Sequence, residues 1–258
     1  MLKILAYIKL IIFFALTLLL LIFFLFFKIQ SKFTNFNFPH KAIRKFWAKS
    51  ILLLCNLKII PKSNLNKRTD AIICNHISWL DIIVLLSLCD IIFVSKSEVK
   101  KWPGFGFLAQ LGDTVFIERK TMSAKLHLEQ ISKRLSKSQK LCIFAEGTSS
   151  DGLKVLPFKS SLFDIFTSFR KKSNEDVFLQ PVSIFYKSPE NKKRDFYGWW
   201  GVMPLFPHII LVLSNFRIAK VYISFNEIIN ASKIGERKEL SRIVENSVRN
   251  SFNNSNDS

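Results

Sequence analysis

The chain opens with one long apolar run and then changes to short apolar runs separated by polar stretches. No charged residue occurs from Leu10 to Phe27, and Lys9 and Lys28 flank this run. At 1.5 Å per helical residue, a run of this length nearly crosses the roughly 30 Å hydrocarbon core of a bilayer. No small-residue cleavage site follows, so the pattern favours a retained membrane helix over a cleaved signal peptide. The helix can either span the bilayer or enter one leaflet.

A second segment, residues 40–57, mixes basic and apolar side chains. Lys41 and Arg44 stand close to Trp47 and to the run from Ile51 to Leu54. This pattern predicts an amphipathic helix at the membrane interface, and a core helix packed on the following domain is the alternative. More basic residues follow the long apolar run than precede it. We therefore expect the rest of the chain on the cytoplasmic side of the inner membrane.

After residue 60, short apolar runs alternate with segments of helical spacing. This alternation is typical of an α/β domain with a largely parallel central sheet flanked by helices. The pattern divides the chain into an N-terminal membrane anchor with an interfacial helix (1–60), a globular domain (61–250) and a disordered tail (251–258). The predicted strands are 71–74, 91–94, 115–117, 141–144, 177–184 and 218–225, and the predicted helices are 80–89, 124–135 and 237–248.

Composition narrows the class of partner. The formal net charge is +19, which suits nucleic acid, an anionic membrane surface or a phosphorylated substrate. The basic residues are spread along the chain and show no aromatic-interleaved RNA-binding signature, which argues against nucleic acid. The four cysteines show no metal-binding spacing and lie in apolar runs, so we interpret them as small buried hydrophobes and predict no metal site.

The first candidate for chemistry is the stretch CNHISWLD, which directly follows a predicted strand. His76 and Asp81 cannot meet on one straight helix, because five residues rotate about 500°. They can meet if His76 lies in the turn before the helix. Asp81 would then orient the imidazole as a general base. In the alternative interpretation, Ser78 and Asp81 form a helix-capping box and His76 is incidental.

Two further polar clusters follow predicted strands, and all three would share one edge of a parallel sheet. Arg119 follows the strand VFI and offers a planar group for phosphate, or is an ordinary surface arginine. Glu146, Gly147 and Thr148 follow the strand LCIF. They can bind a ligand through backbone and hydroxyl groups, or form a plain turn. No serine or cysteine nucleophile motif occurs, so an activated hydroxyl would belong to a substrate.

Taken together, NHISWLD, GDTVFIER, FAEGTSS and LQPVSI resemble the ordered sequence blocks of the glycerolipid acyltransferase family, over residues 65–185. The 1-acyl-sn-glycerol-3-phosphate (lysophosphatidic acid) acyltransferase type is the most similar. The resemblance implies that His76 is the general base and Asp81 its partner. It further implies an acceptor site lined by Phe116 and Arg119, glycerol phosphate binding by Glu146, Gly147 and Thr148, a phosphate-pocket lysine, Lys96, and an acyl-donor side shaped by Pro181 and Val182.

The implied reaction moves an acyl group from acyl-CoA or acyl-ACP to the sn-2 hydroxyl of 1-acyl-glycerol-3-phosphate, giving phosphatidic acid in phospholipid synthesis. These thioesters are co-substrates, and no cofactor or metal is expected. Expected partners are membrane lipids, the lysolipid acceptor and acyl-CoA or acyl carrier protein, without nucleic acid.

Two features keep a second acceptor open. Many family members carry arginine after the EGT triplet, where this chain has Ser149. The segment from Tyr197 to His208 also resembles members that acylate lyso-ornithine lipid. Acylation of lyso-ornithine lipid or another lysolipid is therefore the alternative reaction, and a basic, membrane-bound lipid-binding scaffold is the alternative without catalysis.

Overall fold

The structure is a computed structural model that describes all residues except 1, 31–32, 34–39, 118–123, 174–175 and 257–258. The described residues form one sheet of eight strands, in the order β1-β7-β6-β2-β5-β3-β4, with β8 paired to β6. The neighbours β6, β2, β5, β3 and β4 run parallel, and β7 and β8 are antiparallel to β6. The strands are β1 (Leu57–Pro61), β2 (Ala71–Cys74), β3 (Ile92–Lys96), β4 (Val115–Ile117), β5 (Leu141–Phe144), β6 (Phe178–Lys187), β7 (Ala219–Phe225) and β8 (Ile229–Asn230).

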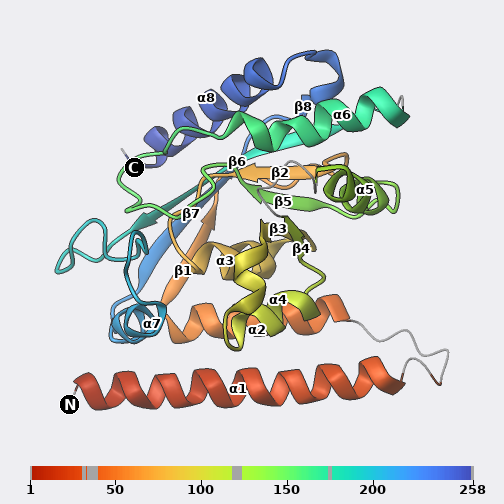
Figure 1. Cartoon of the computed structure of the whole chain (residues 1–258). Coiled ribbons are helices and arrows are strands. Elements are labelled where there is room, and N and C mark those ends of the chain that lie inside the picture. The colour runs from red at the N-terminus through yellow and green to blue at the C-terminus, as the bar shows by residue number, and fades with distance from the viewer. Residues whose placement is uncertain (1, 31–32, 34–39, 118–123, 174–175, 257–258) are drawn as a thin grey trace.

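Helices cover both faces of the sheet, so the α/β prediction with a largely parallel sheet is confirmed. In Figure 1, α6 and α8 lie on one side of the sheet and α2, α3 and α4 on the other, with α1 along the base. The central strands β2 and β5 are almost wholly buried, as strands covered on both faces must be. The helices are α1 (Leu2–Gln30), α2 (His40–Leu54), α3 (Leu80–Leu88), α4 (Phe105–Leu111), α5 (Ala124–Leu135), α6 (Asp164–Ser173), α7 (Leu205–Leu213) and α8 (Arg237–Asn256).

Helix α1 contains the one candidate membrane span among the described residues, Ile4–Gln30, with a mean hydropathy of 3.2 over an 18-residue window. It does not project from the domain but lies lengthwise against α2 and α7 (Figure 1). Trp47 donates its indole N–H to the Thr17 hydroxyl at 3.0 Å, and Lys9 donates to the Asn215 carbonyl at 3.2 Å. The packed side of α1 is thereby tied to the domain at two separate points along its length.

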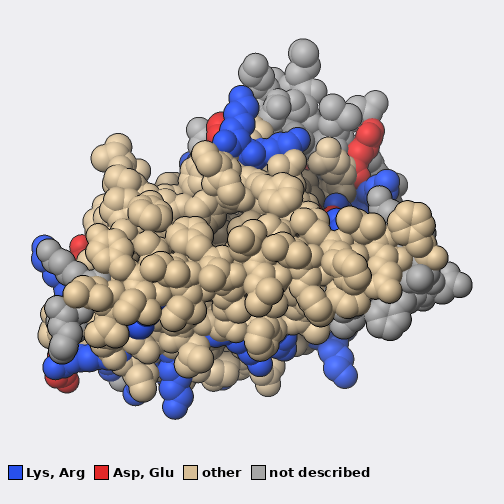
Figure 2. Space-filling view, turned by 90° about the horizontal axis from the view of Figure 1, so that it is seen from below, with Lys and Arg blue, Asp and Glu red and all other residues tan. Residues whose placement is uncertain are grey.

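The opposite side of α1 is an exposed apolar surface. Figure 2, which views the molecule from below, shows a broad uncharged face with Lys and Arg at its margins. Phe206 of α7 stacks on Phe14 of α1 and extends this surface. We call it the apolar base; its exposed large side chains include Ile4, Ile8, Ile11, Phe14, Leu18, Ile22, Phe26 and Phe206.

Both boundaries of the predicted globular domain differ from the sequence prediction. Helix α2 ends before Leu57, because Asn56 adopts a left-handed conformation (φ 52°), and the chain turns into β1 beside β7. The sheet thus begins inside the segment that was assigned to the anchor.

The predicted disordered tail is also wrong from Ser251 to Asn256, which continue helix α8. Its buried stripe Leu240, Val244 and Val248 extends by one more turn to Phe252, which is 1% exposed. The apolar spacing of four residues therefore continues into a stretch that composition alone marks as polar.

Candidate active site

His76 and Asp81 meet in the turn between β2 and α3, as the sequence predicts. Strand β2 ends at Cys74, and α3 begins at Leu80, so His76 precedes the helix and Asp81 lies in its first turn. His76 Nδ1 lies 2.7 Å from Asp81 Oδ2. The Asp81 side chain is fully buried, whereas that of His76 is 16% exposed. The pair therefore has one rigid, dry partner and one partner that a substrate can reach. We call residues 75–79 the His76 loop.

Asp81 is held by three further donors. Its Oδ2 accepts the backbone N–H groups of Ile77 and Ser78 at 2.6 and 2.9 Å. Its Oδ1 accepts the Tyr186 hydroxyl at 2.8 Å. Asp81 thus performs the backbone half of a capping box and orients His76 at the same time. The Ser78 hydroxyl makes no hydrogen bond, so the reciprocal half of that box is absent.

The imidazole of His76 rests on an aromatic platform. Its ring stacks on Phe144 with centroids 4.0 Å apart and planes 15° apart, and Phe144 stacks in turn on Phe93. Cys74 of β2 pairs with Phe144 of β5, so both strands end at the same level. Stacking on Phe144 fixes the plane of the imidazole, and the hydrogen bond to Asp81 fixes its rotation within that plane.

The EGT turn, residues Glu146–Thr148, lies at the same edge of the sheet. Ser150 donates both its backbone N–H and its hydroxyl to the His76 carbonyl, at 2.9 and 3.0 Å. Gly147 has φ +68°, a backbone conformation that L side chains rarely adopt. A Cβ at this glycine would lie 3.1 Å from Lys159 Nζ, so a lysine covers the turn. Thr148 is exposed beside it.

Glu146 has an unusual environment for a carboxyl group. It is 2% exposed, and neither of its oxygens makes a hydrogen bond. Burial raises its pKa to about 8. The backbone N–H groups of His76 and Leu156 act in the opposite direction, but neither reaches hydrogen-bond geometry. A neutral Glu146 at pH 7 can donate a proton as well as accept one.

The remaining predicted residues lie along the same sheet. Val94 of β3 pairs with Ile143 of β5, and Ser95 pairs with Phe116 of β4, which places Phe116 on the same face as Phe144. Lys96 lies one position further along β3 and starts on the opposite face. Arg119 lies outside the described residues.

Pro181 and Val182 are buried in β6, next to β2. They pair with Ile73 and Cys74, the last two residues of β2, so they lie in the sheet beside the point where the His76 loop begins.

Three side chains of this site were not found from the sequence. Tyr186 lies 105 residues from Asp81, and only the pairing of β6 with β2 brings it near. Phe144 was counted as an ordinary strand residue, although it is the platform of the imidazole. Lys159 follows no motif, but its position in PFKSS, shortly after the EGT turn, was a signal.

Cysteines and possible metal ligands are further candidate functional groups. All four cysteines are free and buried, in agreement with the sequence interpretation. Within the described ranges, no three His, Cys, Asp or Glu side chains are grouped as metal ligands would be.

Comparison with known proteins gives this arrangement a family. Residues 56–185 match the profile of the family described as Acyltransferase, and this match contains the His76 loop, the EGT turn and the start of β6. The chain belongs to the acyltransferase family.

Its relatives fall into two groups by name. The lyso-ornithine lipid O-acyltransferase of Rhodobacter capsulatus is 39% identical over 179 residues, which is 69% of this chain and 64% of that protein. The protein of the same name from Rhizobium meliloti is 34% identical over 219 residues, 82% of this chain and 75% of that one. The 1-acyl-sn-glycerol-3-phosphate acyltransferase of Neisseria meningitidis is 27% identical over 179 residues, 68% of this chain and 66% of that one.

A solved structure agrees with the fold. The crystal structure of the 1-acyl-sn-glycerophosphate acyltransferase from Thermotoga maritima has a TM-score of 0.63 at 21% identity, over 99% of this chain and 98% of that one.

Proposed function

We propose that this protein is a membrane-bound O-acyltransferase that moves an acyl group from a thioester donor, acyl-CoA or acyl-ACP, to a lysolipid hydroxyl. The observation that carries this proposal is the 2.7 Å contact between His76 and a fully buried Asp81 at the strand edge that also holds the EGT turn. No other arrangement of polar side chains in the described residues combines a base, its partner and an adjoining ligand-binding turn.

The proposed reaction needs no covalent enzyme intermediate. Asp81 accepts a hydrogen bond from the Nδ1–H group of His76, which leaves Nε2 as the base. Nε2 takes the proton of the lysolipid hydroxyl while the oxygen attacks the thioester carbonyl. A backbone N–H at the EGT turn stabilises the oxyanion, the carbon–sulfur bond breaks, and the thiolate leaves with the proton from the imidazolium.

For the acceptor we propose lyso-ornithine lipid rather than 1-acyl-glycerol-3-phosphate. The resemblance of the sequence blocks favours the phosphorylated acceptor, but the relatives named for lyso-ornithine lipid are 34–39% identical, against 27% for the Neisseria proteins named for the glycerophosphate. Ser149 supports the same choice, because it replaces the arginine that a phosphate would use.

For location we propose that α1 lies in the plane of one leaflet of the inner membrane, on the cytoplasmic side. A helix tied along its length to α2 and α7 cannot cross the bilayer without burying the domain. The apolar base with basic margins is the surface expected of a protein that lies on a membrane (Figure 2). The basic residues after α1 support the cytoplasmic side.

The test offers both acceptors side by side to the purified protein with acyl-CoA or acyl-ACP, and measures thiol release and acylated lipid. We expect transfer to lyso-ornithine lipid, and His76→Ala should lower it by at least about a hundredfold without unfolding the protein. A lipid-binding scaffold would release no thiol with either acceptor. Near wild-type turnover by the His76→Ala protein would refute the assignment of the base.

A further inference from the structure

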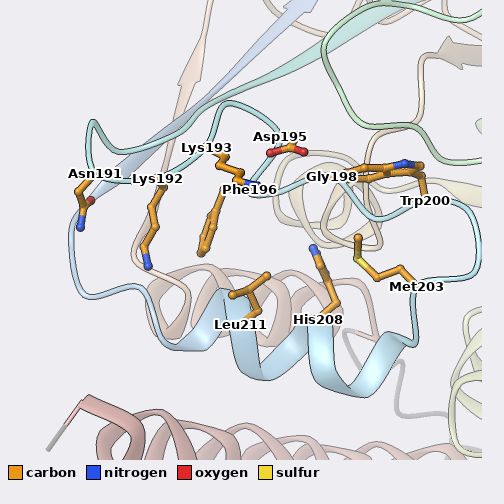
Figure 3. A pocket seen from close by; sticks show the side chains of 10 residues that line it. All are labelled: Asn191, Lys192, Lys193, Asp195, Phe196, Gly198, Trp200, Met203, His208 and Leu211. Carbon is orange, nitrogen blue, oxygen red and sulfur yellow. The ribbon is translucent and has the colours of Figure 1, made fainter.

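A pocket of about 340 Å³ lies next to the His76 loop, between α7 and the segment that leads into it (Figure 3). Two hydrogen bonds fix its walls to that loop. Trp199 donates its backbone N–H to the Ile77 carbonyl at 2.9 Å, and Trp79 donates its indole N–H to His208 Nδ1 at 3.0 Å. The pocket therefore keeps a constant position relative to the proposed base, although it contains none of the site residues described above.

His208 brings an unpaired donor to this pocket. The side chain rises from α7 towards Gly198 and is 2% exposed (Figure 3). Its Nδ1 accepts from Trp79, so the neutral ring carries its proton on Nε2. The carbonyl groups of Gly198 and Phe196 lie near, but Nε2 makes no hydrogen bond. A buried donor without a partner costs folding free energy, and a ligand with an acceptor atom would supply the missing hydrogen bond.

The rim of the pocket carries charges of both signs. Lys192 and Lys193 come from the loop after β6, with Lys192 lying over the Phe196 ring at 5.0 Å. Asp195 is half-buried on the same rim and forms no ion pair or side-chain hydrogen bond with any residue that the structure describes. A phosphate monoester would be repelled by this carboxylate, whereas a group with both a cation and an anion has a partner for each.

We propose that this pocket binds the zwitterionic amino-acid headgroup of the acceptor lipid. The headgroup carboxylate pairs with Lys192, Lys193 and the Nε2–H of His208, and its ammonium group pairs with Asp195. Ornithine attached to a fatty chain through one amine keeps such a carboxylate and a second, cationic amine. This inference rests on the acceptor named under the proposed function and assigns the residues that select it.

The test uses the full-length protein and steady-state kinetics with lyso-ornithine lipid and with lysophosphatidic acid. Asp195→Asn keeps the shape of the side chain and removes its charge. His208→Asn keeps an acceptor for Trp79, but its shorter side chain has no atom at the position of Nε2. We expect each variant to raise KM for lyso-ornithine lipid about tenfold or more, with kcat within about twofold, because a charged hydrogen bond is lost on binding. KM for lysophosphatidic acid should not rise, and Asp195→Asn should lower it if that lipid is a substrate.

The matched control is Glu190→Gln, which removes one negative charge from the same loop outside the pocket and should change neither KM. Unchanged KM for lyso-ornithine lipid in both pocket variants would overturn the headgroup site and leave the acceptor proposal intact. An equal loss with both lipids would also overturn it, since the residues would then act without selecting a headgroup. A wild-type protein that acylates only lysophosphatidic acid would overturn the acceptor and the pocket together.

Discussion

Asp81 and Glu146 are buried carboxyl groups on adjoining loops, yet their surroundings are opposite. Four donors surround Asp81, from the His76 ring, two backbone N–H groups and Tyr186. Glu146 has no hydrogen-bond donor at all. Donors favour a charged carboxylate, and dry burial favours a neutral one. Two carboxyl groups near His76 thus differ: hydrogen-bond donors surround Asp81, whereas dry burial keeps Glu146 neutral.

The raised pKa of Glu146 makes a prediction about stability and pH. The folded state keeps this carboxyl protonated up to about pH 8, whereas in the unfolded chain it has the ordinary glutamate pKa of 4.5. Between these values the unfolded state binds fewer protons, so stability falls as pH rises. Glu146→Gln, which stays neutral, should therefore be more stable than wild type at pH 7, by up to about 3 kcal/mol.

Thermal unfolding at pH 4.5 and at pH 7.5 checks this. The advantage of Glu146→Gln should be present at the higher pH and vanish at the lower one. Glu190→Gln, an exposed control, should show no such difference. An advantage of equal size at both pH values would rule out titration of Glu146 as its cause.

Tyr186 is predicted to position the base through Asp81. Tyr186→Phe removes the hydroxyl that donates to Asp81 Oδ1 at 2.8 Å. We expect kcat to fall about tenfold, because the carboxylate that holds His76 loses one of its anchors. KM for the lysolipid should stay within about twofold, because Tyr186 acts through Asp81 and His76 and not on the bound lipid.

Tyr222→Phe is the matched control, because it makes the same change in β7, outside the site. If Tyr186→Phe lost stability but kept the kcat of wild type, Tyr186 would have only a structural role.

The residues that could be predicted at this scale are those joined by short sequence spacing. His76 and Asp81 are five residues apart, and a strand end followed by an apolar helix suffices to bring them together. Tyr186 and Phe144 depend on which strands pair, and one sequence does not contain that information. Phe144, Tyr186 and Lys159 therefore became visible only in three dimensions.

At the scale of elements, the predictions succeeded where an apolar run had clear polar ends. Strands β2, β4 and β5 and helix α5 have the predicted boundaries. Strand β1 was missed because the apolar pattern of α2 continues into it, and only the left-handed Asn56 separates them. Helix α7 was not among the predicted helices, and its packing against α1 depends on contacts far apart in the sequence.

The last turns of α8 carry a prediction of their own. Phe252 is buried against Phe185 of β6, with ring centroids 5.4 Å apart. Ser251 also contacts Ser183 at 2.9 Å between hydroxyl oxygens. Phe252→Ala should destabilise the protein by about 3 kcal/mol, the usual range for a fully buried phenylalanine. Chemical unfolding measures this.

Asn253→Ala, an exposed neighbour on the same turn, should have almost no effect and serves as control. If both variants were neutral, the end of the chain would not be packed as described.

At the scale of the molecule, the basic margins of the apolar base should govern binding to anionic lipid. Lys45 and Lys49 are exposed on α2, next to α1. Reversing both charges (Lys45→Glu with Lys49→Glu) should weaken binding to vesicles containing anionic lipid by at least about tenfold, because each base near the surface contributes about 1 kcal/mol. The effect should fade at high salt.

The matched control pair, Lys133→Glu with Lys137→Glu, has the same spacing near the end of α5, far from the apolar base (Figure 1). Equal weakening by both pairs would mean that net charge rather than orientation governs adsorption to the vesicles.

Phe13 of α1 lies edge-on against Trp79, with ring centroids 6.4 Å apart, and the same indole holds His208. One tryptophan thus belongs to the His76 loop and contacts both helix α1 and a wall of the neighbouring pocket. A water-soluble fragment made by trimming away the first helix would leave this tryptophan without support on one side. Removing α1 should therefore also make the position of the His76 loop less defined. The full-length protein should be purified in detergent or lipid.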